Sequence, residues 1–118
     1  MPSADFTQGL EGTTEIDLTV TGRSTGRETT RPVWFVRDAD KLDLLPVSGT
    51  DSQWYKNVLA SGRVRIAAEN AEYAGQATAI TDPARVAEVI DAFRAKYGAD
   101  DVANYYPNPN VAVEVPLA

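Results

Sequence analysis

The amino-acid sequence predicts a mainly β fold of the α+β class, or a small closed barrel, with about six antiparallel strands, one long helix and one or two short ones. Several short segments alternate apolar with polar residues, which is the period of a half-buried strand. Short turns separate these segments, and short turns join antiparallel neighbours. One segment, residues 83–97, has the apolar spacing of a long helix.

The first half of the chain contains three predicted strands and two short helices. One helical turn is expected at residues 5–10, and a strand at 15–21 that directs Ile16, Leu18 and Val20 to the core. A second strand is expected at about 30–37, and its residues 32–36 form a nearly continuous apolar run, typical of a strand covered on both faces. A third strand is expected at 41–47. Asp51 or Ser52 is predicted to cap a short helix over 53–60.

The second half contains a predicted hairpin, the long helix and a last strand. The hairpin arms are residues 63–68 and 72–80, around a turn at 69–71. Asp82 followed by Pro83 is a strong helix start, and Gly98 is expected to end that helix. A polar stretch, a rigid turn at 106–110 and a strand at 111–115 follow.

Length and composition exclude several classes of function. The 118 residues suffice for one hydrophobic core, so we expect a single domain over 1–118. A net charge of −6 argues against a nucleic-acid partner. The chain has neither Cys nor His, which excludes thiol nucleophiles, Ser-His-Asp catalysis and His-bound zinc or haem. Chemistry therefore requires a bound cofactor, carboxylates, or Lys, Tyr and Arg.

The N-terminus predicts where in the cell the protein is found, and the distribution of acidic residues predicts that it has no metal site. Residues 1–10 have neither the basic nor the apolar region of a signal peptide, and no segment has the roughly 20 apolar residues of a membrane span. We therefore expect a cytoplasmic protein. The acidic residues are spread as on a solvated face, so no metal site is predicted.

The first candidate functional segment is residues 21–27, together with Arg31. Two glycines allow the backbone to approach a ligand closely, and arginines suit phosphate or carboxylate. Its arginines are Arg23, Arg27 and Arg31. The spacing matches neither a Walker loop nor a dinucleotide fingerprint. On spacing alone, a hairpin turn with solvated arginines is the favoured interpretation.

The second candidate is residues 46–57, a glycine loop between a strand end and a helix start. Such a loop can present free backbone N–H groups to an anionic or carbonyl oxygen. Trp54 and Tyr55 either stack on a planar ring or anchor the helix in the core, and the core is favoured for at least one of them. The third candidate is residues 97–106, where Tyr105 and Tyr106 either close over a site or belong to a surface connection, which is favoured.

Two motifs resemble a known family. Thr-Gly-Arg-x-x-Gly at 21–26 precedes Pro-x-Trp-Phe at 32–35, and a later Ser is followed after five residues by Trp-Tyr-x-Asn-Val-Leu-Ala, ending at 60. Arg-Val-Arg-Ile follows at 63–66. Across residues 15–68 the chain thus resembles the deazaflavin-dependent nitroreductase family. The resemblance implies a six-stranded antiparallel split β-barrel, related to flavin-binding pyridoxamine-phosphate oxidases, and a homodimer.

The resemblance also implies a cofactor groove for deazaflavin (coenzyme F-420). Arg23, Ser24 and Thr25 are then expected near its phosphate or acidic tail, with Arg27 and Arg31 close by. The ring is expected to contact Pro46, Val47, Ser48, Gly49 and Thr50 through the backbone, with support from Trp54 and Asn57. Tyr105 and Tyr106 are assigned to the substrate. The family usually has Lys where this chain has Ser24, so FMN, or no cofactor, is the alternative.

The sequence therefore predicts a reductase that transfers hydride from a reduced deazaflavin or flavin to an electron-poor small-molecule acceptor. In such enzymes the cofactor carries the chemistry and the protein supplies orientation and electrostatics. The alternative is a non-catalytic barrel that binds a flavin-like or apolar ligand. The sequence does not choose between Tyr105, Tyr106 and solvent as the proton source, and it does not identify the acceptor.

Overall fold

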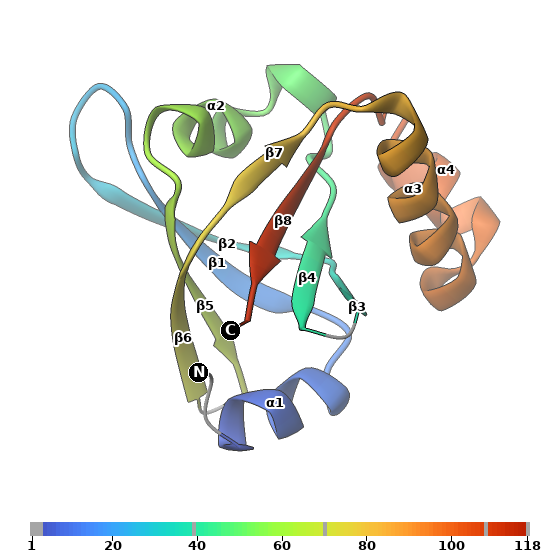
Figure 1. Ribbon diagram of the computed structural model, residues 1–118, viewed down its shortest axis with the longest axis horizontal. Helices are drawn as coiled ribbons and strands as arrows, with labels where there is room; N and C mark the ends of the chain where they lie inside the picture. Colours follow the sequence, from blue (N-terminus) through green and yellow to red (C-terminus); the bar gives the residue numbers. More distant parts are fainter. Residues whose placement is uncertain (1–3, 39, 70, 108, 118) are drawn as a thin grey trace.

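The computed structural model describes residues 4–38, 40–69, 71–107 and 109–117, which form two four-stranded antiparallel sheets and four α-helices (Figure 1). The first sheet has the order β2-β1-β5-β6 and the second β3-β4-β8-β7. The strands are β1 (Ile16–Thr21), β2 (Glu28–Val33), β3 (Val36–Asp38), β4 (Lys41–Leu44), β5 (Arg63–Ala68), β6 (Ala71–Gln76), β7 (Thr78–Ile80) and β8 (Ala112–Pro116). The helices are α1 (Ala4–Glu11), α2 (Gln53–Ala60), α3 (Pro83–Tyr97) and α4 (Ala99–Tyr105), with a 3-10 turn η1 (Gly49–Asp51) before α2.

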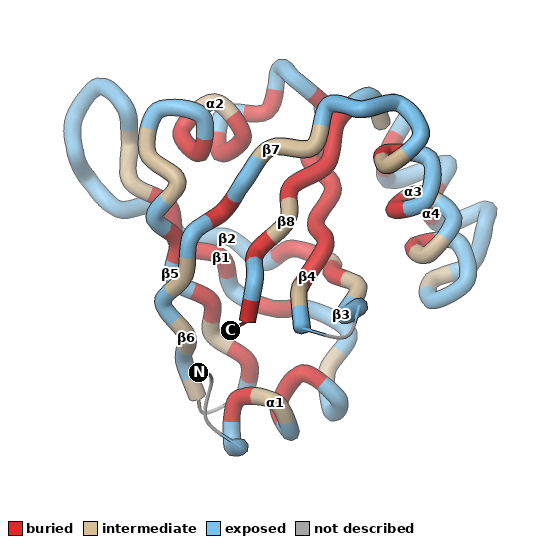
Figure 2. Tube along the Cα trace, viewed as in Figure 1, coloured by how far each residue is buried: buried red, intermediate tan, exposed pale blue. Residues whose placement is uncertain are grey.

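The two sheets enclose one hydrophobic core. Alternate residues of β1, namely Ile16, Leu18 and Val20, are buried there as predicted. Helix α1 covers one end of this core and α2 the other, and both contribute buried side chains (Figures 1 and 2). A second buried cluster lies between α3, α4 and the outer face of the second sheet; its buried members are Leu45, Val86, Val89, Phe93, Val102, Tyr106 and Ala112.

The predicted count of six strands is wrong, because two predicted strands each divide where the chain passes between sheets. The segment predicted as 30–37 divides into β2 and β3, separated by Trp34 and Phe35. The arm predicted as 72–80 divides into β6 and β7, separated by the buried Ala77. Both divisions let one stretch of chain pair in each sheet, which joins the sheets at two corners.

The prediction that the second strand is covered on both faces is also wrong. In β2 every residue but Val33 is exposed, because β2 is the edge strand of the first sheet and pairs on one side with β1. The apolar residues that suggested a covered strand, Trp34 and Phe35, lie beyond the end of β2, in the corner between the two sheets.

The helices α2 and α3 have the predicted bounds, whereas α4 was not expected. Asp82 caps α3 through its carboxylate, which accepts from the Ala84 N–H at 3.4 Å. Gly98 ends α3 and begins α4 with a φ of 98°, a value that side chains other than glycine rarely adopt. The polar stretch predicted as a surface connection is therefore largely helical. Parts of three predicted connections, at Ala39, Asn70 and Asn108, lie outside the described residues.

Candidate functional site

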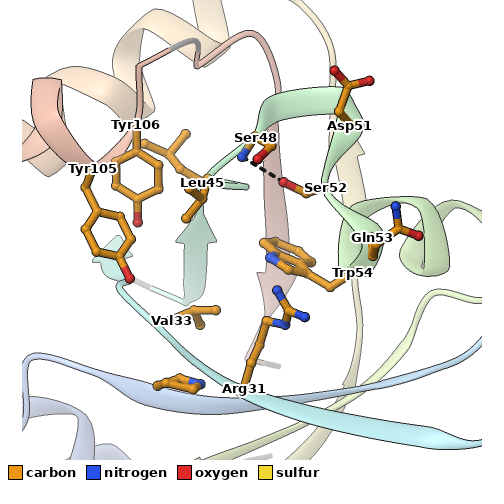
Figure 3. Close-up of a pocket in the computed structure, with 12 residues that line it drawn as sticks. Arg31, Val33, Leu45, Ser48, Asp51, Ser52, Gln53, Trp54, Tyr105 and Tyr106 are labelled. Atoms are coloured by element: carbon orange, nitrogen blue, oxygen red, sulfur yellow. Dashed lines mark hydrogen bonds between the residues drawn. The ribbon is translucent and has the colours of Figure 1, made fainter.

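A cavity of about 480 Å³ lies where β2, the segment after β4, the start of α2 and the end of α4 meet (Figure 3). This volume is within the ordinary range of ligand pockets. The lining residues are Arg31, Pro32, Val33, Leu45, Val47, Ser48, Asp51, Ser52, Gln53, Trp54, Tyr105 and Tyr106. They come from four segments of the chain, so the cavity exists only in the folded protein.

All three candidate segments of the sequence meet at this cavity. Arg31 comes from the first, Val47, Ser48 and Trp54 from the second, and Tyr105 and Tyr106 from the third. The other predicted site residues do not line it; they are Arg23, Ser24, Thr25, Arg27, Pro46, Gly49, Thr50 and Asn57. Sequence reasoning missed the apolar walls Pro32, Val33 and Leu45, which give no signal that separates them from core residues. Asp51, Ser52 and Gln53 were inside the second segment but were not assigned to the site.

One end of the cavity is aromatic. Tyr105 is 46% exposed, and its ring stacks on Trp34 with a centroid distance of 4.7 Å. Tyr106 is 2% exposed and meets Phe93 edge-on. Burial raises the pKa of the Tyr106 phenol well above its ordinary value, so this group stays protonated at neutral pH. No described residue forms a hydrogen bond with the Tyr106 hydroxyl, which leaves it available to a ligand atom.

The other end of the cavity carries the positive charge of Arg31, and the carboxylate of Asp51, also a lining residue, points away from it (Figure 3). Figure 3 shows the Arg31 guanidinium extending toward the Trp54 indole. Within the described part of the chain, no carboxylate pairs with Arg31. An unpaired guanidinium in a concave site is suited to a phosphate or carboxylate.

Arg23 lies beside this end and is held by neutral groups. Asn57 Oδ1 accepts from the Arg23 backbone N–H at 3.1 Å and from its Nη1 at 2.7 Å. Gln53 Oε1, on the cavity wall, accepts from Arg23 Nη2 at 2.9 Å. Because both partners are uncharged amides, the positive charge of Arg23 is not neutralised. Asn57, which is buried, thus fastens the turn between β1 and β2 to α2.

The glycine loop before α2 does not offer the free N–H groups that the sequence suggested. The Ser48 N–H donates to Ser52 Oγ at 2.9 Å, the Gly49 N–H to the Pro46 carbonyl at 3.1 Å, and the Thr50 N–H to Asn110 Oδ1 at 3.1 Å. Ser52 stands at the N-cap position of α2 as predicted, but its hydroxyl accepts from Ser48 rather than from the helix. The loop is therefore a rigid wall and not a preformed anion site.

Neither a metal cluster nor a membrane span is found in the described residues. No group of three or more carboxylates is placed to hold a metal ion there. The helices described are too short or too polar to cross a bilayer.

Comparisons with known proteins place this geometry in a family and a fold. Residues 8–114 match the family model described as "Uncharacterized protein conserved in bacteria (DUF2255)". The chain belongs to the DUF2255 family. No curated protein matches the sequence.

Solved structures resemble this DUF2255 protein at low sequence identity. An F420-H2 dependent reductase (FDR-A) is 17% identical with a TM-score of 0.63, covering 86% of this chain and 93% of its own. A putative pyridoxamine 5'-phosphate oxidase from Listeria innocua is 16% identical with a TM-score of 0.69, covering 94% and 89%. HutZ, the heme storage protein from Vibrio cholerae, is 12% identical with a TM-score of 0.73, covering 95% and 87%. These likenesses support the predicted split-barrel fold and, at this identity, show the fold alone.

Proposed function

We propose that this DUF2255 protein binds a flavin-type cofactor, deazaflavin (coenzyme F-420) or FMN, and acts as a reductase on an electron-poor small molecule. The observation that carries the proposal is the polarity of the cavity, which is aromatic at the Tyr105 end and cationic at the Arg31 end. A planar ring joined to a phosphate matches both ends. Two structures with a similar fold are named as an F420-H2 dependent reductase and a putative pyridoxamine 5'-phosphate oxidase.

The residues present fit such a cofactor. Arg31 would receive the phosphate, and the unneutralised charge of Arg23 would add attraction at the same end. Val47 and Ser48 would bound the ring, and Trp54, which lies beside Arg31, would bound the phosphate end. When bound, a reduced ring supplies the hydride, and the protein orients it and excludes water.

The predicted residues outside the cavity keep supporting roles in this proposal. Pro46, Gly49 and Thr50 shape the loop, and Asn57 holds Arg23. Ser24, Thr25 and Arg27 lie on the exposed turn between β1 and β2. They would meet a ligand that extends beyond the cavity, as the acidic tail of a deazaflavin would.

Non-catalytic binding of a flavin-like or apolar ligand is the second candidate function. The hydrogen-bonded state of the Ser48, Gly49 and Thr50 N–H groups favours it, because these groups are not free to stabilise negative charge that develops on a ring. Oxidation of the reduced cofactor by an added quinone or nitro compound, measured by absorbance, separates the two. Saturable binding without turnover would favour the binding module.

We extend the proposal to a cytoplasmic homodimer. Among the described residues, one large apolar side chain outside the cavity stays exposed on a single copy: Leu59 of α2 is 61% exposed. A second copy would cover such a residue. Sedimentation velocity tests this part, and a monomer at micromolar concentration would contradict it.

Arg31→Gln tests the cationic end of the cavity. A charge-assisted hydrogen bond contributes about 1.5–3 kcal/mol, so FMN affinity should fall about 10- to 100-fold. Affinity for riboflavin, which lacks the phosphate, should stay unchanged. Fluorescence titration measures both. The matched control is Arg63→Gln, an exposed arginine of β5 outside the cavity. Equal losses for the two variants would contradict the role of Arg31.

Asn57→Asp in the same assay separates charge from folding. An aspartate keeps the acceptor for Arg23 but neutralises its charge, so the turn stays fastened while attraction for phosphate falls. We expect FMN binding to weaken and the melting temperature to be retained. Unchanged FMN affinity would show that Arg23 takes no part in binding.

A further inference from the structure

Three aromatic rings form a continuous column that ends at the cavity. Tyr97 and Trp34 stack at a centroid distance of 4.3 Å with planes 10° apart. Trp34 and Tyr105 stack at 4.7 Å with planes 20° apart. Trp34 therefore has a ring against each of its faces, and Tyr105 is the end of the column that reaches the cavity.

The other end of the column is fixed to the barrel. The Tyr97 hydroxyl accepts from the Phe35 N–H at 3.0 Å and lies 2.7 Å from the Thr14 carbonyl, to which it donates. Lys96 Nζ donates to the Phe35 carbonyl at 2.7 Å and lies 3.5 Å from the centre of the Phe35 ring. These bonds hold the end of α3 against the corner between β2 and β3, so Tyr97, on which Trp34 stacks, is anchored to the barrel.

The free face of Tyr105 is an exposed aromatic surface at the cavity. Trp34 covers one face of the ring and the Tyr106 ring lies 5.2 Å away at a tilt of 58°, yet 46% of Tyr105 is exposed, so part of the residue away from Trp34 is accessible. The three other aromatic candidates are less suitable. Trp54 is 3% exposed and packs in the barrel core, and Tyr55 is equally buried and does not line the cavity. Tyr106 lines the cavity but is 2% exposed. A planar ligand ring therefore finds one accessible aromatic face among the described lining residues.

We propose that the ligand ring stacks on the free face of Tyr105 as the fourth ring of this column, and that Trp34 is the positioning residue that holds Tyr105 in place. This inference rests on the proposed function, because it concerns the ligand of the same cavity. It assigns the ring to Tyr105 rather than to Trp54, where the helix motif would place it. Offset stacking of aromatic rings adds a favourable term beyond the buried area.

The test measures binding of two oxidised probes, lumichrome, which is a flavin-like ring without side chain or phosphate, and FMN. The variants are Tyr105→Leu, Tyr105→Phe, Trp34→Leu and the double variant Trp34→Leu with Tyr105→Leu. Tyr105→Leu should weaken lumichrome binding about fivefold, and Tyr105→Phe, which keeps the ring, should not. The fluorescence of bound FMN should be quenched in the wild type and brighter at saturation in Tyr105→Leu.

The double variant separates positioning from general destabilisation. If Trp34 acts through Tyr105, Trp34→Leu weakens binding in the wild type but adds no further loss once Tyr105 is Leu. The matched control is Phe93→Leu, which removes a ring that contacts Tyr97 and Tyr106 rather than Tyr105. It should lower the melting temperature without the loss of lumichrome affinity.

The outcomes distinguish the stacking site at Tyr105 from the proposed binding of a flavin-type cofactor. Wild-type lumichrome affinity in Tyr105→Leu, or an equal effect of Trp34→Leu in both backgrounds, would overturn the inference. FMN binding that is independent of Tyr105 would leave the proposed function standing and remove the stacking site. Lumichrome binding that depends on Tyr105, without binding of FMN or deazaflavin, would support the stacking site and contradict the phosphate-bearing cofactor. Failure of the wild type to bind lumichrome, FMN or deazaflavin would overturn both.

Discussion

At the scale of single residues, Asp43 is a buried carboxylate whose surroundings disfavour its charge. It lies on β4 opposite Glu114 of β8, is 3% exposed, and its Oδ1 has no hydrogen-bond partner among the described residues. Burial raises the pKa of Asp43 above its ordinary value of 3.8, although Lys41 and Arg85 act in the opposite direction. The folded state therefore binds this proton more tightly than the unfolded chain does.

We predict that Asp43→Asn stabilises the protein at neutral pH by about 1 kcal/mol. Because the folded pKa is raised, ionised Asp43 lowers stability above that pKa, and this cost disappears as the pH falls through the folded pKa toward 3.8. The gain from Asn should shrink over the same window in thermal unfolding followed by circular dichroism. Asp17→Asn, which changes an exposed carboxylate of β1, is the control. A less stable Asp43→Asn at pH 7 would show that attraction to Lys41 and Arg85 dominates.

Side-chain chemistry made some site residues predictable and hid others. Arg31 and Tyr105 carry polar groups that a core position does not require, so the sequence could mark them as site candidates. Both line the cavity. Val33 and Leu45 line it too, but an apolar wall has the same sequence signal as a core residue. The prediction of free N–H groups was wrong because these groups have acceptors that local sequence does not reveal. Ser52 Oγ is placed by the loop conformation, and Asn110 Oδ1 belongs to a residue distant in sequence.

At the scale of elements, α4 determines where the aromatic end of the cavity stands. Helix α4 follows α3 directly through Gly98, and its last residue is Tyr105. Val102 is its buried residue, so α4 lacks the repeated apolar spacing that made α3 predictable. In the sequence only Gly98 indicated that the chain changes direction after α3, and a glycine there is as consistent with a loop as with the start of a second helix.

We predict that Gly98→Ala destabilises the protein by about 1–3 kcal/mol and weakens FMN binding. An added Cβ meets no atom within 4 Å, so the cost arises from the φ of 98° and not from a clash. Relief of this strain would shift α4 and with it Tyr105. The control is Ala95→Gly on the exposed face of α3, which costs about 1 kcal/mol through helix propensity and leaves the junction at Gly98 unchanged. Denaturant unfolding measures the stability of both variants and titration measures their FMN affinity. Equal FMN affinities would contradict the role of the junction at Gly98.

At the scale of the whole molecule, the cavity results from two sheets that are joined at two corners, where one stretch of chain passes from a strand of one sheet to a strand of the other. Local patterns predicted most strand and helix positions, because alternation and capping are local properties. They did not predict that the chain divides at Trp34 and at Ala77, since these divisions depend on which sheet each half pairs with. The meeting of three distant segments at one cavity likewise depends on tertiary packing.

The most direct test of the central claim, that this cavity binds a flavin-type ring, is a titration of the 15N-labelled protein with FMN and with deazaflavin, followed by amide and indole NMR shifts. We predict that the largest changes occur at Arg31, Ser48 and Tyr105 and at the indole N–H of Trp54, with small changes on the outer face of β1 and β5. Saturable shifts confined to another surface, or no shifts with either compound at millimolar concentration, would contradict the account.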